Sequence, residues 1–375
     1  MTKFKHALVS NLMINRVILY TKDKFNYRSI GNQKSTIKIK LFAFLIALFT
    51  ITSCTKDDTF WETSKESSST DMTLKGYTPK NDLTNWNSWM AAIKDNVPLA
   101  RISIPGTHDS GTFELKNPIK RVWAKTQDCN FLNQMNNGIR FFDIRVRATN
   151  NNTFMLHHGS IYLYIGLHRF LNDAKTFLKQ HPSETIIMSI KKDHTSAKNA
   201  TKNVTDIFRD SYYSPNSIFY KANSDNPTLG ETRGKIVIFN RLPNSSSISS
   251  FPYCGWKDNA TFSHMINKKL TLNVQDQYNI KYWPKKDAIR NFLKKTNNNL
   301  DDRQLFINYT SLASGGTIWS SPYYFAKYFN PETAHFIEHN IKNRAGWVIM
   351  DYAGNKWNPK LHEKVILTNR SLTKK

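Results

Sequence analysis

Short apolar, β-prone runs recur along the chain between residues 100 and 350, and segments with helical spacing separate several of them. The segment 167–180 repeats apolar residues at helical intervals and stops before Pro182, and the segment 287–295 has a similar pattern. Strands that alternate with helices are typical of a parallel sheet, and about eight such strands are typical of a barrel. The runs that we predict as strands are 100–104, 140–146, 153–156, 185–190, 235–239, 270–274, 305–307 and 347–350.

Polar, reactive residues follow directly after several of these runs. The first run leads into a Pro-Gly pair (105–106), whose glycine frees the backbone to turn and to expose His108 and Asp109. The segments Phe-Asp-Ile-Arg (142–145) and Leu-His-His-Gly (156–159) repeat this arrangement. Two histidines, an arginine and carboxylates at strand ends suit proton transfer around a phosphate.

Charged residues alternate with apolar residues in the segment 141–147. Asp143, Arg145 and Arg147 share one face of the predicted strand, and apolar side chains occupy the other face. Charges that point into a barrel must be paired or functional. An inward ion-pair network that only stabilises the barrel is the alternative, but histidines at neighbouring strand ends favour a functional site.

The first 53 residues are predicted to be a lipoprotein-type signal segment, whose true start may be encoded further downstream because its charged part is long. Lys38 and Lys40 precede the apolar run 41–49, which is too short to span a bilayer comfortably. The run ends at Ile51-Thr52-Ser53-Cys54, which resembles a bacterial lipobox with Cys54 as the lipidated residue. An ordinary secretory signal with an incidental cysteine is the alternative.

Residues 54–81 are rich in Ser, Thr, Lys and Glu and lack apolar periodicity, which predicts a flexible tether. Residues 82–375 then form the folded domain. The Lys56-Asp57-Asp58 segment is similar to acidic signals that carry some Gram-negative lipoproteins outward. We therefore expect an exported protein that is lipid-anchored in the outer membrane or at the cell surface, or secreted if the lipobox is not used.

The chain is strongly basic, with 53 Lys and Arg against 28 Asp and Glu and a net charge of +25. Such a balance favours nucleic acid or an acidic membrane as a partner, although a merely solvated basic surface is the alternative. Because no nucleic-acid-binding signature is present, we expect no nucleic-acid partner. The three cysteines include no Cys-x-x-Cys pair and indicate no thiol or zinc chemistry; a disulfide between Cys129 and Cys254 stays open.

From about Asp82 to Asn369 the chain resembles the bacterial phosphatidylinositol-specific phospholipases C. The resemblance implies an α/β fold, a distorted TIM (β/α)8-type barrel in a single catalytic domain, with its chemistry at the carboxyl ends of the strands. It rests on ordered motifs: His108–Thr112, Asn117–Lys120 with Trp123, Phe142–Arg145, Leu156–Gly159, Pro182–Ser189, Ser314–Thr317, and Gly346–Ile349 before Asp351-Tyr352.

The resemblance implies cleavage of phosphatidylinositol to diacylglycerol and 1D-myo-inositol 1,2-cyclic phosphate, with glycosylphosphatidylinositol anchors left open as a second target. His108 is implied as the general base, with its ring oriented by Asp351. His158 is implied as the general acid, assisted by Asp109. Arg145 would hold the phosphate with its planar, permanently charged fork.

The same resemblance implies a set of inositol-binding residues near strand ends. Adjacent strand residues face opposite ways, and because the resemblance selects His158 for the site, we expect His157 to pack behind it. Charged groups bond strongly to vicinal hydroxyls, and a tyrosine ring stacks on a sugar-like face. The residues implied to bind inositol are Asp143, Lys191, Arg241, Asp276 and Tyr278.

We expect no metal ion and no other cofactor. Calcium-dependent phospholipases need acidic ligands near the phosphate, whereas Arg145 would place a fixed cation there. A glycerophosphodiester phosphodiesterase is the alternative enzyme, but it needs a carboxylate metal cluster and no Glu follows closely after His108. A non-catalytic surface module that binds inositol or lipid on the same barrel is the alternative outside enzymes; no implied catalytic position is substituted, which favours the enzyme.

Two short segments are candidates for a membrane interface. Ile119, Lys120 and Trp123 follow Pro118, and Trp319 follows the flexible Ser-Gly-Gly run at 314–316. Exposed aromatic residues beside lysines are typical of interfacial anchors, and nearby tyrosines can hold choline by cation–π contact. Burial of these aromatics in the core is the alternative. The expected partners are membrane phosphatidylinositol, GPI-anchored proteins and an anionic or phosphatidylcholine-containing surface. We expect the protein to be a monomer.

Overall fold

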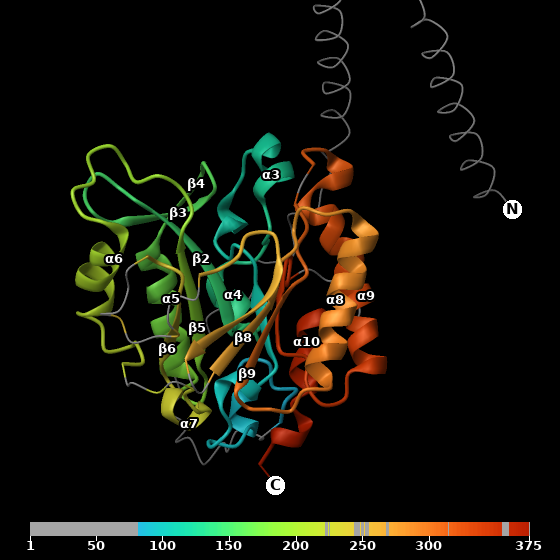
Figure 1. The fold of residues 1–375 in the computed structure, drawn as a ribbon. Helices are drawn as coiled ribbons and strands as arrows, with labels where there is room; N and C mark the ends of the chain where they lie inside the picture. The colour runs from blue at the N-terminus through green and yellow to red at the C-terminus, as the bar shows by residue number, and fades with distance from the viewer. Residues whose placement is uncertain are drawn as a thin grey trace, which may run out of the picture. The chain divides into compact units, whose positions relative to one another are not determined.

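A ten-stranded mixed sheet forms the centre of the folded domain in the computed structural model (Figure 1). The structure describes residues 82–374, apart from 222, 223, 225, 244–247, 249, 250, 252–254, 268, 269, 314 and 355–359. The predicted signal segment, Cys54, the tether 54–81 and Cys254 therefore lie outside the described residues. The strands are β1 Ile104–Thr107, β2 Phe141–Ala148, β3 Phe154–His158, β4 Ile161–Gly166, β5 Ile186–Lys192, β6 Ile236–Asn240, β7 Thr261–Asn267, β8 Leu270–Gln275, β9 Gln304–Tyr309 and β10 Trp347–Met350.

Seven of the strands run parallel, in the order β6-β5-β2-β1-β10-β9-β8. The hairpin of β3 and β4 adds to β2 in antiparallel direction, and β7 pairs antiparallel with β8. Within the part of the chain that the structure describes, no strand pairing joins β6 to β7 or β8. The expected α/β fold of distorted TIM-barrel type is thus confirmed, with the barrel open at that seam.

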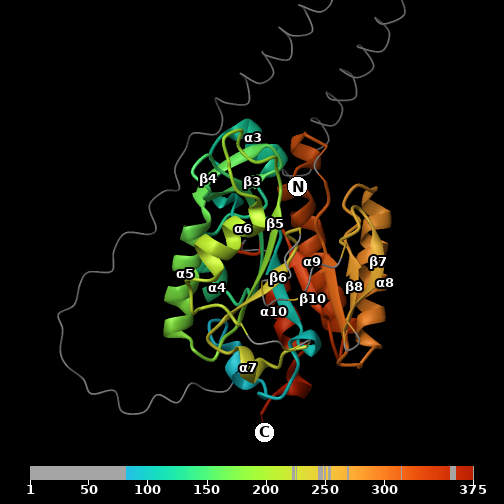
Figure 2. The same cartoon turned by 60° about the vertical axis from the view of Figure 1, so that its left-hand side comes forward.

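Helices cover the outer face of the sheet, with α5 on one flank and α8 and α9 on the other (Figures 1 and 2). None of the described helices is long and apolar enough to cross a bilayer. The α-helices are α3 Pro118–Ala124, α4 Phe131–Asn136, α5 Leu167–Gln180, α6 Val204–Ile207, α7 Leu229–Thr232, α8 Tyr282–Asn297, α9 Pro322–Asn340 and α10 Leu361–Leu367. Shorter turns are Trp89–Ala92, Leu99–Arg101, Thr112–Glu114, Phe208–Tyr213, Ile318–Ser320 and Arg370–Leu372.

The helical prediction for 167–180 is confirmed, because α5 spans those residues and buries Phe170, Ala174 and Phe177 at helical spacing. The helix predicted at 287–295 is longer than expected. It begins at Tyr282 because Pro284 lies in the first turn, where its missing N–H breaks no helical bond.

Two strand predictions need correction. The first two residues of the run 100–104 belong to a 3₁₀ turn, since Arg101 and Ile102 donate their backbone N–H groups to the carbonyls of Pro98 and Leu99. The strand starts only at Ile104. The run 153–156 is a strand, but it belongs to the antiparallel β3–β4 hairpin and not to the parallel barrel wall.

The sheet separates two apolar cores. Side chains on the outer face, such as Phe142 and Ile144 of β2, pack against the helices. Side chains on the inner face, such as Phe141 of β2 and Trp347 of β10, fill the barrel, with ring centres 5.7 Å apart. Because alternate residues of a strand face opposite sides, one sheet supplies both cores. The inner core fills the half of the barrel at the amino ends of the parallel strands, which is its lower half in Figure 1. The carboxyl ends of these strands carry polar side chains.

Candidate active site

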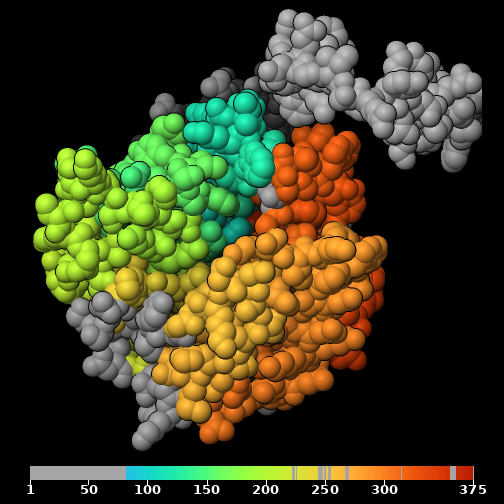
Figure 3. Space-filling view, turned by 45° about the horizontal axis from the view of Figure 1, so that its top comes forward, coloured from blue at the N-terminus to red at the C-terminus, as the bar shows by residue number. Residues whose placement is uncertain are grey.

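A cavity of about 520 Å³ opens where the parallel strands end. Figure 3 views this end of the domain, with α3 (teal) beside the segment that leads into α9 (red-orange) at the rim. The cavity lining comes from many different strands, which is why residues distant in the sequence meet there. The charged and aromatic lining residues are His108, Trp123, Arg145, His158, Lys191, Asp193, Arg241, Asp258, Asp276, Tyr278 and Asp351.

The inner face of each parallel strand changes from apolar to polar toward its carboxyl end. On β2, Phe141 lies in the inner core, and Arg145 four residues later lines the cavity. Side chains two or four positions apart share one face of a strand, so the same strand fills the barrel and then builds the site. The same spacing leads from Ile104 to His108, from Ile187 to Lys191, from Phe239 to Arg241, from Val274 to Asp276 and from Ile349 to Asp351.

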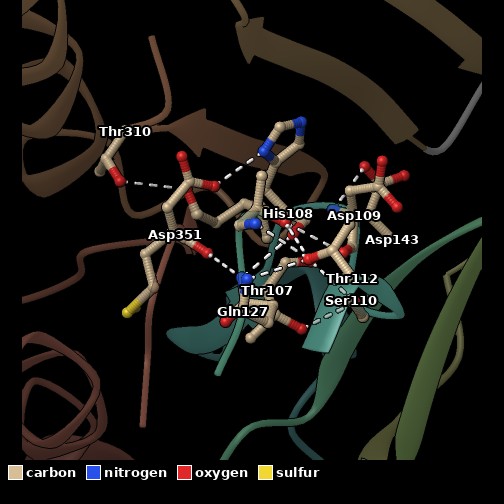
Figure 4. A network of polar contacts seen from close by, with 12 residues as sticks. Thr107, His108, Asp109, Ser110, Thr112, Gln127, Asp143, Thr310 and Asp351 are labelled. Atoms are coloured by element: carbon tan, nitrogen blue, oxygen red, sulfur yellow. Dashed lines mark hydrogen bonds and ion pairs between the residues drawn. The ribbon is translucent and has the colours of Figure 1, made fainter. Parts of the chain in front are cut away.

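His108 and Asp351 form a hydrogen-bonded pair at the ends of β1 and β10. The Nδ1 atom of His108 lies 2.8 Å from Oδ1 of Asp351, and Figure 4 shows the carboxylate aimed at the imidazole ring. The side-chain amide of Gln127 donates to the backbone carbonyls of His108 (3.0 Å) and Met350 (2.9 Å). These bonds join the ends of β1 and β10, and the bond to Asp351 orients the ring of His108.

His158 faces His108 across the cavity. The two ring centres lie 6.3 Å apart at an angle of 74°. The Nδ1 atom of His158 lies 2.7 Å from Oδ2 of the buried Asp109, although the ring orientation does not align the two for a hydrogen bond. Each imidazole therefore has its own carboxylate behind it. Both rings line the same cavity.

The backbone is strained beside both carboxylates. Asp109 has a φ of 40° and Tyr352, next to Asp351, has a φ of 51°. Left-handed conformations at residues other than glycine cost about 1–3 kcal/mol and are found at functional sites. At Tyr352 the strained turn is held by its backbone N–H, which donates to the carbonyl of Thr126 at 2.6 Å.

Arg145 lies among three carboxylates. Its Nε and a terminal nitrogen each lie 2.9 Å from Oδ2 of Asp143, and Asp109 and Asp193 lie within 3.7 and 3.8 Å of the guanidinium. Burial would lower the pKa of Arg145, but these carboxylates outweigh it and raise the pKa well above its usual value. Burial would likewise raise the pKa of Asp143, yet Arg145 and Arg241 hold it far below its usual range. Arg145 is therefore a permanent cation at the cavity wall.

Asp193 is a site residue that the sequence analysis missed. Its carboxylate lies 2.9 Å from Nζ of Lys191 and accepts a hydrogen bond from the backbone N–H of Gly159. Burial opposes its charge, but Arg145 and Lys191 hold the pKa of Asp193 well below its usual value. Its place just after β5, two residues beyond Lys191, is the signal that could have identified it.

Further groups that the sequence analysis missed support the expected inositol-binding residues. The guanidinium of Arg241 stacks on the ring of Trp256 at 3.9 Å, and the indole N–H of Trp256 donates to Asp276 at 3.0 Å. The hydroxyl of Tyr278 donates to both oxygens of Asp258 at 2.8 Å. Trp256 and Asp258 precede β7, where the sequence shows no strand-end pattern.

Other predicted residues lie around the cavity. Asp143 is fully buried beneath Arg145, and its other oxygen lies 3.8 Å from Arg241. His157, on β3, is buried with 2% of its surface exposed and packs against Tyr162 and His194, as expected for the residue that faces away from the site. Among the described side chains, no group of three or more His, Cys, Asp or Glu residues is arranged to hold a metal ion.

The candidate membrane residues gather on two neighbouring segments at the rim. Ile119 on α3 is 74% exposed and Trp319, in the short turn before α9, is 69% exposed. Trp123 is half exposed and packs over Gly316, since a Cβ atom at Gly316 would lie 1.8 Å from its ring. Lys120 lies beside them on α3 and is exposed. The two segments thus form one exposed aromatic and aliphatic patch next to the cavity mouth.

The barrel fold and the two histidines beside carboxylates suit acid–base chemistry, and comparisons with known proteins give the family of the chain. The family model for "Phosphatidylinositol-specific phospholipase C, X domain" matches residues 102–242. The 1-phosphatidylinositol phosphodiesterase of Staphylococcus aureus strain Newman is 46% identical over 278 residues, which cover 72% of this chain and 89% of the relative. The 1-phosphatidylinositol phosphodiesterase of Listeria monocytogenes is 32% identical over 173 residues, 42% of this chain and 52% of the relative.

Comparison with solved structures gives the same family. A crystal structure of phosphatidylinositol-specific phospholipase C from Staphylococcus aureus matches with a TM-score of 0.75 and 43% identity, over 76% of this chain and 98% of that one. The enzyme from Listeria monocytogenes matches with a TM-score of 0.60 and 25% identity, over 76% and 99%. The chain belongs to the bacterial phosphatidylinositol-specific phospholipase C family and is an enzyme.

The position of Asp193 generates a first prediction. In Asp193→Asn an oxygen still reaches the N–H of Gly159, but the charge that pairs with Arg145 and Lys191 is lost. Since charge-assisted hydrogen bonds contribute about 1.5–3 kcal/mol, we expect kcat/KM on phosphatidylinositol to fall ~10–100-fold. The matched control is Asp210→Asn, which removes an exposed carboxylate that does not line the cavity. A kcat/KM within twofold of the wild type would contradict the role of Asp193.

Proposed function

We propose that the protein cleaves phosphatidylinositol to diacylglycerol and 1D-myo-inositol 1,2-cyclic phosphate. The observation that carries the proposal is the pair of adjacent imidazoles, each beside a carboxylate, with Arg145 lining the same cavity. An intramolecular phosphodiester cleavage needs a base, an acid and a fixed cation, and the cavity offers one of each.

His108 acts as the base. A hydrogen bond from its Nδ1–H to Asp351 leaves Nε2 free to take the proton of the inositol 2-hydroxyl. The deprotonated oxygen attacks phosphorus, so the bond from the 2-oxygen to phosphorus forms while the bond to the glycerol oxygen breaks. Asp351 stabilises the imidazolium that results, in the manner of other carboxylate–histidine pairs.

His158 acts as the acid and gives its proton to the departing diacylglycerol oxygen. The carboxylate of Asp109 lies 2.7 Å from its Nδ1. Water can then open the cyclic phosphate slowly when His158 takes a proton from water and His108 returns its proton to the 2-oxygen.

Arg145 supplies the positive charge that stabilises the phosphoryl oxygens, and the reaction then needs no metal ion. The three carboxylates around the guanidinium fix its plane before substrate arrives, so little reorganisation accompanies the reaction. Asp143 contributes through Arg145 and Arg241, because it lies beneath both of them.

Inositol is held by the polar groups on the far wall of the cavity. Lys191 lies on β5 and Asp193 follows it, Arg241 with its stacked Trp256 follows the neighbouring β6, and Tyr278 follows β8. Several donors and acceptors that converge from different strands suit a ring with many hydroxyls. Either a free lipid or a GPI anchor presents this ring, so both are targets under this proposal.

The exposed patch of α3 and Trp319 contacts the lipid surface from which the substrate is drawn. A solved structure of the Staphylococcus aureus relative addresses its membrane binding. Large apolar side chains beside Lys120 suit insertion at an interface with anionic or phosphatidylcholine headgroups. Lipidation at Cys54 stays a prediction from the sequence; it would anchor the enzyme near such a surface.

Replacement of either histidine by alanine tests the acid–base assignment. We expect His108→Ala and His158→Ala each to lower turnover of phosphatidylinositol by ~10²–10⁴-fold, since each removes one proton-transfer group. His168→Ala, on the exposed face of α5, is the matched control. Phosphorus NMR of treated vesicles measures the cyclic product, and circular dichroism checks the fold. Near-wild-type turnover by either variant would refute its assigned role.

Chelation and substitution of Arg145 test whether the positive charge at the phosphate comes from the guanidinium or from a metal ion. We expect wild-type turnover to survive EDTA, because the guanidinium is covalently part of the site. Arg145→Lys keeps a charge but loses the two-pronged contact, and a loss of ~10–100-fold in kcat/KM is expected from the strength of charge-assisted hydrogen bonds. Turnover that stops with EDTA and returns with calcium would overturn the metal-independent mechanism.

The rim patch is tested by separating binding from chemistry. We expect the double variant Ile119→Ala, Trp319→Ala to bind vesicles of phosphatidylcholine, phosphatidylglycerol and phosphatidylinositol at least tenfold more weakly, since burial of each such side chain contributes ~1.5–3 kcal/mol. Hydrolysis of soluble cyclic inositol phosphate should not change. Leu300→Ala, an exposed residue just before β9 at the opposite end of the barrel, is the control. Unchanged sedimentation with vesicles would exclude the patch from the interface.

A further inference from the structure

Lys285 is a lysine buried directly behind the site. It lies in the first turns of α8, and its side chain has no exposed surface. Its Nζ donates to Oε1 of Gln275 at 3.1 Å. Lysine is almost never fully buried without a charged partner in contact, and a cation near the start of a helix is opposed by the helix dipole.

Burial at this position is unfavourable for the charged amine. It lowers the pKa of Lys285 to about 7, although the carboxylates of Asp276 and Asp351 act in the opposite direction. These two belong to the cavity and follow β8 and β10. Lys286 and Glu332, on α8 and α9, pair with each other at 2.8 Å. A methionine of similar volume would avoid this cost, so packing alone does not explain the lysine.

The amide of Gln275 connects Lys285 to the cavity wall. Besides the amine of Lys285, its Oε1 accepts the backbone N–H of Gln277 at 2.9 Å. Its Nε2 donates to Oδ1 of Asn308 at 2.7 Å and to the carbonyl of Tyr309 at 2.9 Å. Both the oxygen and the nitrogen of the amide therefore have partners, and the amine of Lys285 helps to fix the orientation of the amide.

The bond to Gln277 shapes the segment 276–278, which leaves β8 and lines the cavity with Asp276 and Tyr278. On its other side this segment is tied to the residue that precedes β7: the backbone N–H of Asp276 donates to the carbonyl of Ala260 at 3.0 Å. The segment is thus held between residues 256–260 and Gln275. Loss of the donor at position 285 removes half of the bonding to Oε1 of Gln275.

We propose that Lys285 is a positioning residue for the reaction: through Gln275 it holds the segment 276–278 in the geometry that binds inositol. The proposal rests on the proposed function, because it assigns inositol binding to this segment. Lys285 itself touches neither substrate nor the reacting atoms.

The test compares Lys285→Met with Lys286→Met, a control that removes the neighbouring amine from the same helix. We expect Lys285→Met to raise KM for soluble myo-inositol 1,2-cyclic phosphate about tenfold and to leave kcat within about threefold, as expected for lost binding geometry. The dissociation constant for myo-inositol, measured by titration calorimetry, should rise by a similar factor. Lys286→Met should match the wild type in both.

The same variant should be more stable than the wild type. The folded protein binds the proton of Lys285 only below about pH 7, whereas the unfolded chain keeps it to about pH 10.5. The penalty for burying the charged amine is therefore full below pH 7 and diminishes as pH rises above 7. Lys285→Met should raise Tm at pH 6, and the increase should be smaller at pH 8.5.

Higher Tm together with weaker inositol binding supports the positioning role. A lower Tm would make Lys285 a structural residue, and unchanged KM and dissociation constant would remove it from the binding machinery; either result overturns the proposal. If the wild type binds myo-inositol but does not turn over the cyclic phosphate, the proposed function is contradicted, and the calorimetric comparison still decides the role of Lys285.

Discussion

The site depends on one guanidinium that three buried or nearly buried carboxylates surround. Without Arg145, the charges of Asp109, Asp143 and Asp193 would be too costly to hold out of water. Each carboxylate has a second contact: Asp109 with His158, Asp143 with Arg241 and Asp193 with Lys191. The cation of β2 therefore fixes groups from the turn after β1, the β3–β4 hairpin, β5 and β6, and this makes the site rigid before a ligand arrives.

The barrel provides the support for this cluster. Its strands fill the lower interior with side chains such as Phe141, Trp347 and Ile349, and then present charged side chains two or four residues later. A densely packed apolar floor keeps water out from below and leaves the polar groups few positions to adopt. The same strands therefore build the apolar core with their first residues and the site with their last residues.

Some unfavourable local features lie beside the site, at the carboxyl ends of the parallel strands. Asp109 and Tyr352 have left-handed backbones, and Lys285 is buried with a pKa near 7. At the lower end, by contrast, the buried Arg140 has a charged partner in Glu184, with nitrogen and oxygen 2.7 Å apart. Unfavourable features at a site persist because the packing of the rest of the fold maintains the local geometry.

The sequence determined the α/β class, the position of most strands, the helix α5 and the family, because these follow from local periodicity and from motifs such as those around His108 and His158. It also identified most charged groups on the cavity wall, since polar residues after β-prone runs meet at one end of a barrel. Only the tertiary structure decided that Asp193, Trp256 and Asp258 belong to the site, that Asp143 lies beneath it, and that Lys285 faces it from a helix. The physical reason is that the direction of a side chain in a loop or on a helix depends on packing against elements far away in the sequence, which periodicity along one segment does not contain.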